Sequence, residues 1–68
     1  MKKGQYFKLV GDYRGVVWDG RRWVRFDCDA CVRRWGIATE RLQGPMTDKA
    51  NEAMKGPVTY RHVNGTHN

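Results

Sequence analysis

Residues 16–26 read VVWDGRRWVRF, and this stretch decides the fold. Runs rich in Val, Trp and Phe flank an Asp-Gly pair, which predicts a β-hairpin because Gly20 adopts the positive φ of a tight turn without steric cost. A two-residue loop places Trp18 opposite Arg21, whereas a four-residue loop places Trp18 opposite Trp23. Both loops contain an even number of residues, so both give the same division of side chains between the two faces.

These two faces differ in chemistry. One face is apolar, and we expect it in the core; it carries Val17, Val24 and Phe26. The other face interleaves cations with large aromatic rings; it carries Arg14, Val16, Trp18, Arg21, Trp23 and Arg25. Unpaired bases stack on aromatic rings and arginine binds phosphate through paired hydrogen bonds, so this face is typical of a nucleic-acid surface. The alternative is that both tryptophans belong to the core while the arginines extend into solvent.

Length and charge narrow the class of protein. The 68 residues predict one small β-rich domain over 1–68, with 1–4 and 64–68 flexible. The net charge is +6, and residues 1–35 hold nine Lys or Arg against four Asp. A basic half favours an anionic partner, most commonly nucleic acid, although this charge also suits simple solubility. No apolar run is long enough to span a membrane and no signal peptide is recognisable, so we expect a cytoplasmic protein without a membrane partner.

The remaining elements follow from local patterns. We expect strands over 6–10, 13–18, 21–27 and 58–63, and a helix over 48–55 that Thr47 caps. Residues 27–34 form a turn or a short helix capped by Asp27 or Asp29. Residues 35–43 fit a strand or a helix, and we favour the strand because Gly36 costs a helix roughly 1 kcal/mol relative to Ala.

The first hairpin has two registers. A two-residue loop at 11–12 puts Tyr6 on the same face as Val17, whereas a three-residue loop puts Phe7 and Leu9 there. A slip of one residue exchanges the two faces of a strand, so the choice determines the core. We prefer the second register, because the first leaves apolar side chains on both faces. The expected core is then Phe7, Leu9, Val17, Val24 and Phe26.

The fold class predicted by this order of elements is mainly β (α+β). We expect a small twisted sheet, or an SH3-like or OB-like partly open barrel, with one short helix. The alternative is a sheet of three or four strands packed against one helix. Barrels are favoured at this length because curling reduces the number of exposed strand edges.

The cysteines raise the question of metal binding. Cys28 and Cys31 form a C-x2-C pair, and with His62 and His67 they are candidate zinc ligands. The segment between the Cys pair and the His pair is far longer than in a compact zinc finger, so we predict no metal and no other cofactor. A redox role lacks the βαβ context of a thioredoxin-like motif. The simplest expectation is two reduced thiols, one of them buried.

No catalytic motif occurs, so we predict a protein that is not an enzyme. The leading hypothesis is a small basic module that binds DNA or RNA, single-stranded or structured, with low sequence specificity. Lys2 and Lys3 extend its basic track. The predicted binding residues are Arg14, Trp18, Arg21, Arg22, Trp23, Arg25, Arg33 and Arg34. The alternative is a compact regulatory or inhibitory protein that binds an acidic surface of a larger protein.

Overall fold

An antiparallel meander of three strands forms the centre of the molecule. The computed structural model describes the backbone of residues 1–63 and 66–67, and the side chains of residues 1–61. Strand β1 (Gln5–Lys8) pairs with β2 (Gly15–Trp18), which pairs with β3 (Trp23–Phe26). The predicted meander is therefore confirmed.

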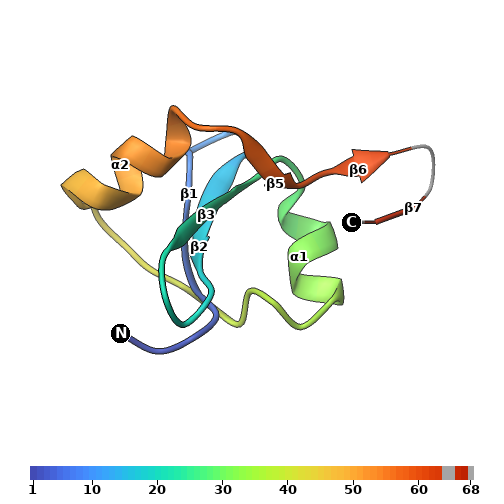
Figure 1. Cartoon of the computed structure of the whole chain (residues 1–68), viewed down its shortest axis with the longest axis horizontal. Coiled ribbons are helices and arrows are strands. Elements are labelled where there is room, and N and C mark those ends of the chain that lie inside the picture. Colours follow the sequence, from blue (N-terminus) through green and yellow to red (C-terminus); the bar gives the residue numbers. More distant parts are fainter. Residues whose placement is uncertain (64–65, 68) are drawn as a thin grey trace.

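Two short strands extend the meander into a mixed sheet. Strand β4 (Glu40–Arg41) pairs in parallel with β1, and β5 (Val58–Tyr60) pairs in parallel with β3. The five strands run in the order β4-β1-β2-β3-β5, so the sheet is open, with β4 and β5 at its edges (Figure 1). Strands β6 (His62–Val63) and β7 (Thr66–His67) form a separate antiparallel pair.

Helix α1 (Asp29–Arg34) forms where a turn or a short helix was expected. Its N-cap is Cys28, whose Sγ accepts a hydrogen bond from the Cys31 N–H at 3.3 Å, so the expected caps Asp27 and Asp29 were wrong. Gly36 has a φ of +75° just after the helix. This conformation is unfavourable for other residues and ends the helix. Of the strand favoured over 35–43, only Glu40–Arg41 forms a strand, β4.

Helix α2 (Asp48–Met54) confirms the second predicted helix. Thr47 is the N-cap, and its hydroxyl accepts a hydrogen bond from the Ala50 N–H at 3.3 Å. The described part of the chain therefore contains two helices, where the predicted fold class had one and residues 27–34 were expected to form a turn or a short helix. No helix within these described residues is long and apolar enough to cross a membrane.

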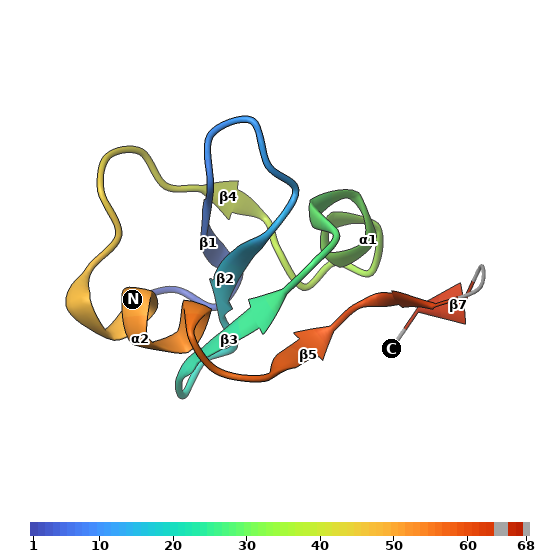
Figure 2. The ribbon, with the colours of Figure 1, turned by 90° about the horizontal axis from the view of Figure 1, so that it is seen from above.

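The two helices lie on opposite faces of the sheet (Figures 1 and 2). On one face, Val32 of α1 packs on the sheet in a cluster whose buried members are Tyr6, Val17, Val24, Phe26, Val32 and Ala38. On the other face, Ala50 of α2 packs on Phe7, Val16 and Trp23, with Leu42 and Met46 partly buried beside them. Both faces of the meander are therefore buried.

This double coverage explains why the preferred register was wrong. Tyr6 lies opposite Val17 and shares its cluster, whereas Phe7 faces the other way. Leu9 lies outside both clusters and is 36% exposed. The observed register places apolar side chains on both faces of the meander. This would be unfavourable if one face were exposed to water, but α2 covers the face that carries Phe7.

Candidate nucleic-acid interface

The turn between β2 and β3 is organised around Asp19. Trp18 lies opposite Trp23, which makes residues 19–22 the four-residue loop. The Asp19 carboxylate accepts hydrogen bonds from the backbone N–H groups of Arg21 at 2.7 Å and Arg22 at 2.8 Å. The bonds from Arg22 and Arg21 stabilise the ionised carboxylate and lower the pKa of Asp19 below its usual value. With the backbone fixed in this way, the side chains of Arg21 and Arg22 remain exposed.

The N-terminal segment lies against this turn. The Gly4 N–H donates to the carbonyl of Trp18 at 2.8 Å, so the chain crosses the end of β2. The side-chain carbons of Lys3 lie 4.0 Å from the place that a Cβ on Gly20 would occupy. Lys3 therefore brings another cation to the turn.

A cavity of about 400 Å³ opens between the hairpin tip and α2. We call it the tip pocket; it is lined by Trp18, Arg21, Arg22, Trp23, Lys49, Glu52 and Ala53. The hairpin residues were predicted from the sequence. Lys49 was missed, because its helical pattern does not say which strand its helix will lie beside. Glu52 is the only acidic side chain among these lining residues.

The two tryptophans of the tip pocket are unequal. Trp23 is only 9% exposed, and its ring packs on Phe7 with the centroids 5.5 Å apart. Trp18 is half-buried, and it contacts Trp23 edge to face. Trp18 is therefore the ring with surface left for a ligand, while Trp23 supports it from behind.

Arg25 is held by the structure rather than left free. It follows Trp23 by two residues on β3, as predicted, but one of its terminal nitrogens donates to the carbonyl of Gly56 at 3.1 Å. Its Nε also lies 3.7 Å from the carboxylate of Asp27. Arg25 thus ties the end of α2 to the sheet.

The other predicted cations lie away from the tip pocket. Arg14 lies at the opposite end of β2, where it pairs with Asp12 at 2.9 Å. This hydrogen bond raises the pKa of Arg14 and lowers that of Asp12. Arg33 and Arg34 belong to α1, across the sheet, and Arg33 lies 3.3 Å from Asp29. The structure therefore gathers half of the predicted residues at one place, namely Trp18, Arg21, Arg22 and Trp23.

The predicted zinc candidates do not form a metal site among the described residues. Cys28 and Cys31 are joined in a disulfide, in place of the two reduced thiols that were expected. Cys31 is buried at 6% exposure. The side chains of His62 and His67 lie outside the described residues. Within the part of the chain that the structure describes, no group of three or more His, Cys, Asp or Glu is placed to hold a metal ion.

No protein-family model, curated protein or solved structure matches this chain. What the tip pocket binds is therefore inferred from its own side chains. They offer one partly exposed indole ring, several cations and a single carboxylate. Such a set suits a ligand that is both flat and anionic.

Proposed function

We propose that this protein is a small, non-catalytic module that binds nucleic acid through the tip pocket with low sequence specificity. The observation that supports the proposal is that half-buried Trp18 shares one cavity with the exposed side chains of Arg21 and Arg22. An unpaired base stacked on an aromatic ring contributes ~1–3 kcal/mol, and each guanidinium can bind a flanking phosphate. Lys49 adds a cation to the pocket from α2, and Lys3 lies beside the β2–β3 turn.

Size and charge support the same ligand. A cavity of about 400 Å³ lies within the range of small-molecule sites, so one nucleotide fits while the strand continues outside. Stacking and phosphate contacts do not read base edges, which accounts for the low specificity. Paired bases in a duplex are already stacked on their neighbours. We therefore expect unpaired bases in single strands, loops or bulges to bind best.

Titration of the protein with single-stranded DNA, duplex DNA and RNA tests the proposal directly. Tryptophan fluorescence should be quenched by single strands, because Trp18 is a wall of the pocket. Arg21→Ala and Arg22→Ala should each weaken binding of all sequences alike and reduce its salt dependence by about one phosphate contact. Arg34→Ala is the matched control, since it removes the same charge from the other side of the sheet.

Comparison of these variants distinguishes binding at the tip pocket from attraction by the net positive charge of the protein. If Arg34→Ala weakens binding as much as Arg21→Ala, the net charge and not the tip pocket binds the strand. Trp18→Ala should cost ~1–3 kcal/mol of binding, while Trp18→Phe should retain part of it because a ring remains. A folded Trp18→Ala protein that binds as tightly as the parent would rule out stacking on Trp18.

A second candidate function rests on the loop between β1 and β2. This loop exposes Val10 at 94%, Tyr13 at 60% and Leu9 at 36%, next to exposed Arg14. Apolar and aromatic side chains beside a cation are typical of protein contacts, and they fit a compact regulator that docks on an acidic surface. Complexes that survive nuclease treatment and are lost in Val10→Asp, but not in Arg21→Ala, would favour this function.

Neither candidate depends on the finer predictions about the fold. An SH3-like or OB-like curl of the open sheet stays a prediction, as does a cytoplasmic location. The absence of catalysis also stays a prediction. An assay for hydrolysis of the bound oligonucleotide during the titrations would test it.

A further inference from the structure

The disulfide between Cys28 and Cys31 is a feature that the tip pocket does not use. Its two residues are separated by three positions, and their Cα atoms lie 5.2 Å apart. A cross-link stabilises a fold mainly by restricting the unfolded chain, and the effect increases with the length of the loop that it closes. A disulfide that closes so short a loop contributes little to the stability of the fold. A chemical role of the cysteine pair is therefore considered.

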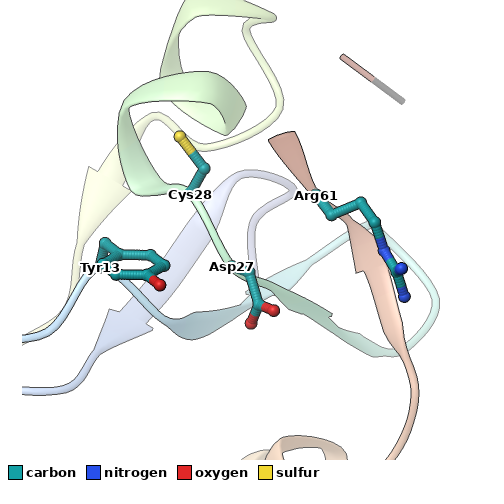
Figure 3. Close-up of a pocket in the computed structure, with 4 residues that line it drawn as sticks. All are labelled: Tyr13, Asp27, Cys28 and Arg61. Atoms are coloured by element: carbon teal, nitrogen blue, oxygen red, sulfur yellow. The ribbon is translucent and has the colours of Figure 1, made fainter. Parts of the chain in front are cut away.

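The environments of the two cysteines differ. Cys31 is buried at 6% exposure, whereas Cys28 is partly exposed. Cys28 lines a cavity of about 500 Å³ together with Tyr13, Asp27 and Arg61. Figure 3 shows the Cys28 sulfur directed toward α1, with the carboxylate of Asp27 and the guanidinium of Arg61 directed away from that sulfur. Cys28 is therefore the more accessible residue of the pair, because it borders this cavity whereas Cys31 is buried.

We propose that Cys28 and Cys31 form a thiol–disulfide exchange site, with Cys28 as the sulfur that partners attack. The thiolate of a dithiol partner attacks the Cys28 Sγ, and the bond between the Cys28 and Cys31 sulfurs breaks. The Cys31 Sγ leaves with the electron pair and takes up a proton. The partner and Cys28 are then joined in a mixed disulfide.

A second thiolate of the same partner completes the reaction. It attacks the partner's own sulfur in the mixed disulfide, and the Cys28 Sγ leaves as a thiolate. The partner is oxidised to a disulfide, the cysteine pair is reduced to the Cys31 thiol and the Cys28 thiolate, and two electrons have passed to the protein. The Cys31 N–H, which lies 3.3 Å from the Cys28 Sγ, stabilises the thiolate that is released.

The reaction requires no rearrangement of the fold. Helix α1 is held to the sheet by Val32, whose side chain is fully buried in the cluster with Val17 and Phe26. The helix therefore keeps its place after the sulfurs separate. The exchange site lies beside α1 and the tip pocket lies under α2, so the two activities are measured independently.

Mapping of glutathione adducts on the parent protein tests the proposal without any variant. The oxidised chain is incubated in glutathione buffers, trapped with an alkylating agent and digested for mass spectrometry. We expect the adduct on Cys28 to exceed that on Cys31 by about tenfold or more, because access decides which sulfur is attacked. Equal adducts, an excess on Cys31, or no opening even with excess dithiothreitol would overturn the proposal.

Two variants measure the difference in accessibility between Cys28 and Cys31 as a difference in reaction rate. Cys31→Ala leaves the Cys28 thiol, and Cys28→Ser leaves the Cys31 thiol while keeping a good N-cap residue. With an aromatic disulfide reagent, Cys31→Ala should react about tenfold faster than Cys28→Ser, with thermal melts confirming that both are folded. Equal rates in folded variants would contradict the assignment. A parent protein that purifies with both thiols on stoichiometric zinc would also overturn it, whatever the outcome of the oligonucleotide titrations.

Discussion

Trp18 and Trp23 lie directly opposite each other on β2 and β3, with their ring centroids 5.5 Å apart and their planes at 67°. Trp23 belongs to the core, and Trp18 lies at the surface beside it. Trp23 packs between Phe7 and α2 and is 9% exposed, whereas Trp18 keeps part of its ring open to the tip pocket. One indole therefore supports the fold while its neighbour is available to a ligand.

Alanine substitutions should separate these two roles. Trp23→Ala leaves a cavity beneath α2 and should cost ~3–5 kcal/mol of stability, a large share of the ~5–15 kcal/mol typical of a domain. Trp18→Ala should cost clearly less, since its side chain is only half-buried. Urea denaturation followed by circular dichroism measures both. Equal losses of stability would mean that the two rings do not differ as described.

The carboxylate of Asp19 should contribute to stability in a pH-dependent way. Its folded-state pKa is lowered by the backbone N–H groups of Arg22 and Arg21, so its contribution is complete above the unfolded pKa and is lost as pH falls through the folded pKa. Asp19→Asn keeps an acceptor oxygen but does not titrate, and its stability should change less with pH below about 4. Melts of both proteins across acidic pH would decide this.

Loss of the acceptor itself is tested separately. Asp19→Ala should cost about 1–2 kcal/mol at neutral pH, because the loop loses two hydrogen bonds to its backbone. Should Asp19→Ala melt with the parent while remaining folded, the carboxylate would not be organising the turn.

Gly15 should not tolerate even a methyl group. A Cβ there would overlap the carbonyl oxygen of Phe7 and lie 2.6 Å from the ring of Phe26. Gly15→Ala should therefore destabilise the protein by about 1–3 kcal/mol through overpacking. Gly56→Ala is the matched control, since its Cβ meets only the carbonyl of Ala53 at an ordinary 3.5 Å. Thermal melts should show a lowered midpoint for Gly15→Ala alone, and equal midpoints would contradict the close approach.

Gly20 tests the backbone of the turn rather than its packing. Its φ is +104°, and nothing lies closer than 4.0 Å to the place of a Cβ. Gly20→Val should cost about 1–3 kcal/mol because a β-branched residue resists this conformation. An unchanged melting midpoint would show that the loop readily adopts another backbone conformation.

Chelation tests the prediction that no metal is needed. With Cys28 and Cys31 joined to each other, their sulfurs are not available as thiolate ligands. A chelator should leave the circular dichroism and the melting midpoint of the oxidised protein unchanged. Unfolding on chelation, with zinc found by elemental analysis, would instead identify Cys28, Cys31 and His62 as ligands.

Local signals in the sequence predicted the parts of the fold that local contacts determine. The Asp19-Gly20 pair between apolar runs gave the β2–β3 hairpin and the correct division of its faces. Thr47 ahead of a run of good helix formers gave α2 and its cap. In both elements the deciding interactions lie within a few residues along the chain.

Other features depend on contacts between distant segments. The register of β1 was misjudged because nothing near Phe7 in sequence reveals that Ala50 will cover it. For the same reason, the sequence could not distinguish a buried Trp23 from an exposed one, nor place Lys49 beside Arg22. The sequence thus predicted the aromatic and basic side chains of the hairpin. It did not predict that α2 would form a second wall and make the site a cavity.

Parallel pairing at both sheet edges implies an order of folding. The β1–β2–β3 meander joins consecutive strands, and hairpins form in ~1–10 μs. By contrast, Arg25 of β3 pairs with Val58 of β5, which is distant along the chain. The chain must lose the entropy of closing this long loop before the two strands can form hydrogen bonds, so this pairing is slow. Ala50 of α2 likewise packs on Phe7, which is distant along the chain, so the hairpin wall of the tip pocket forms early and the wall supplied by α2 forms later. During synthesis, the pocket is completed only after α2 has emerged, because side chains of this helix form its second wall.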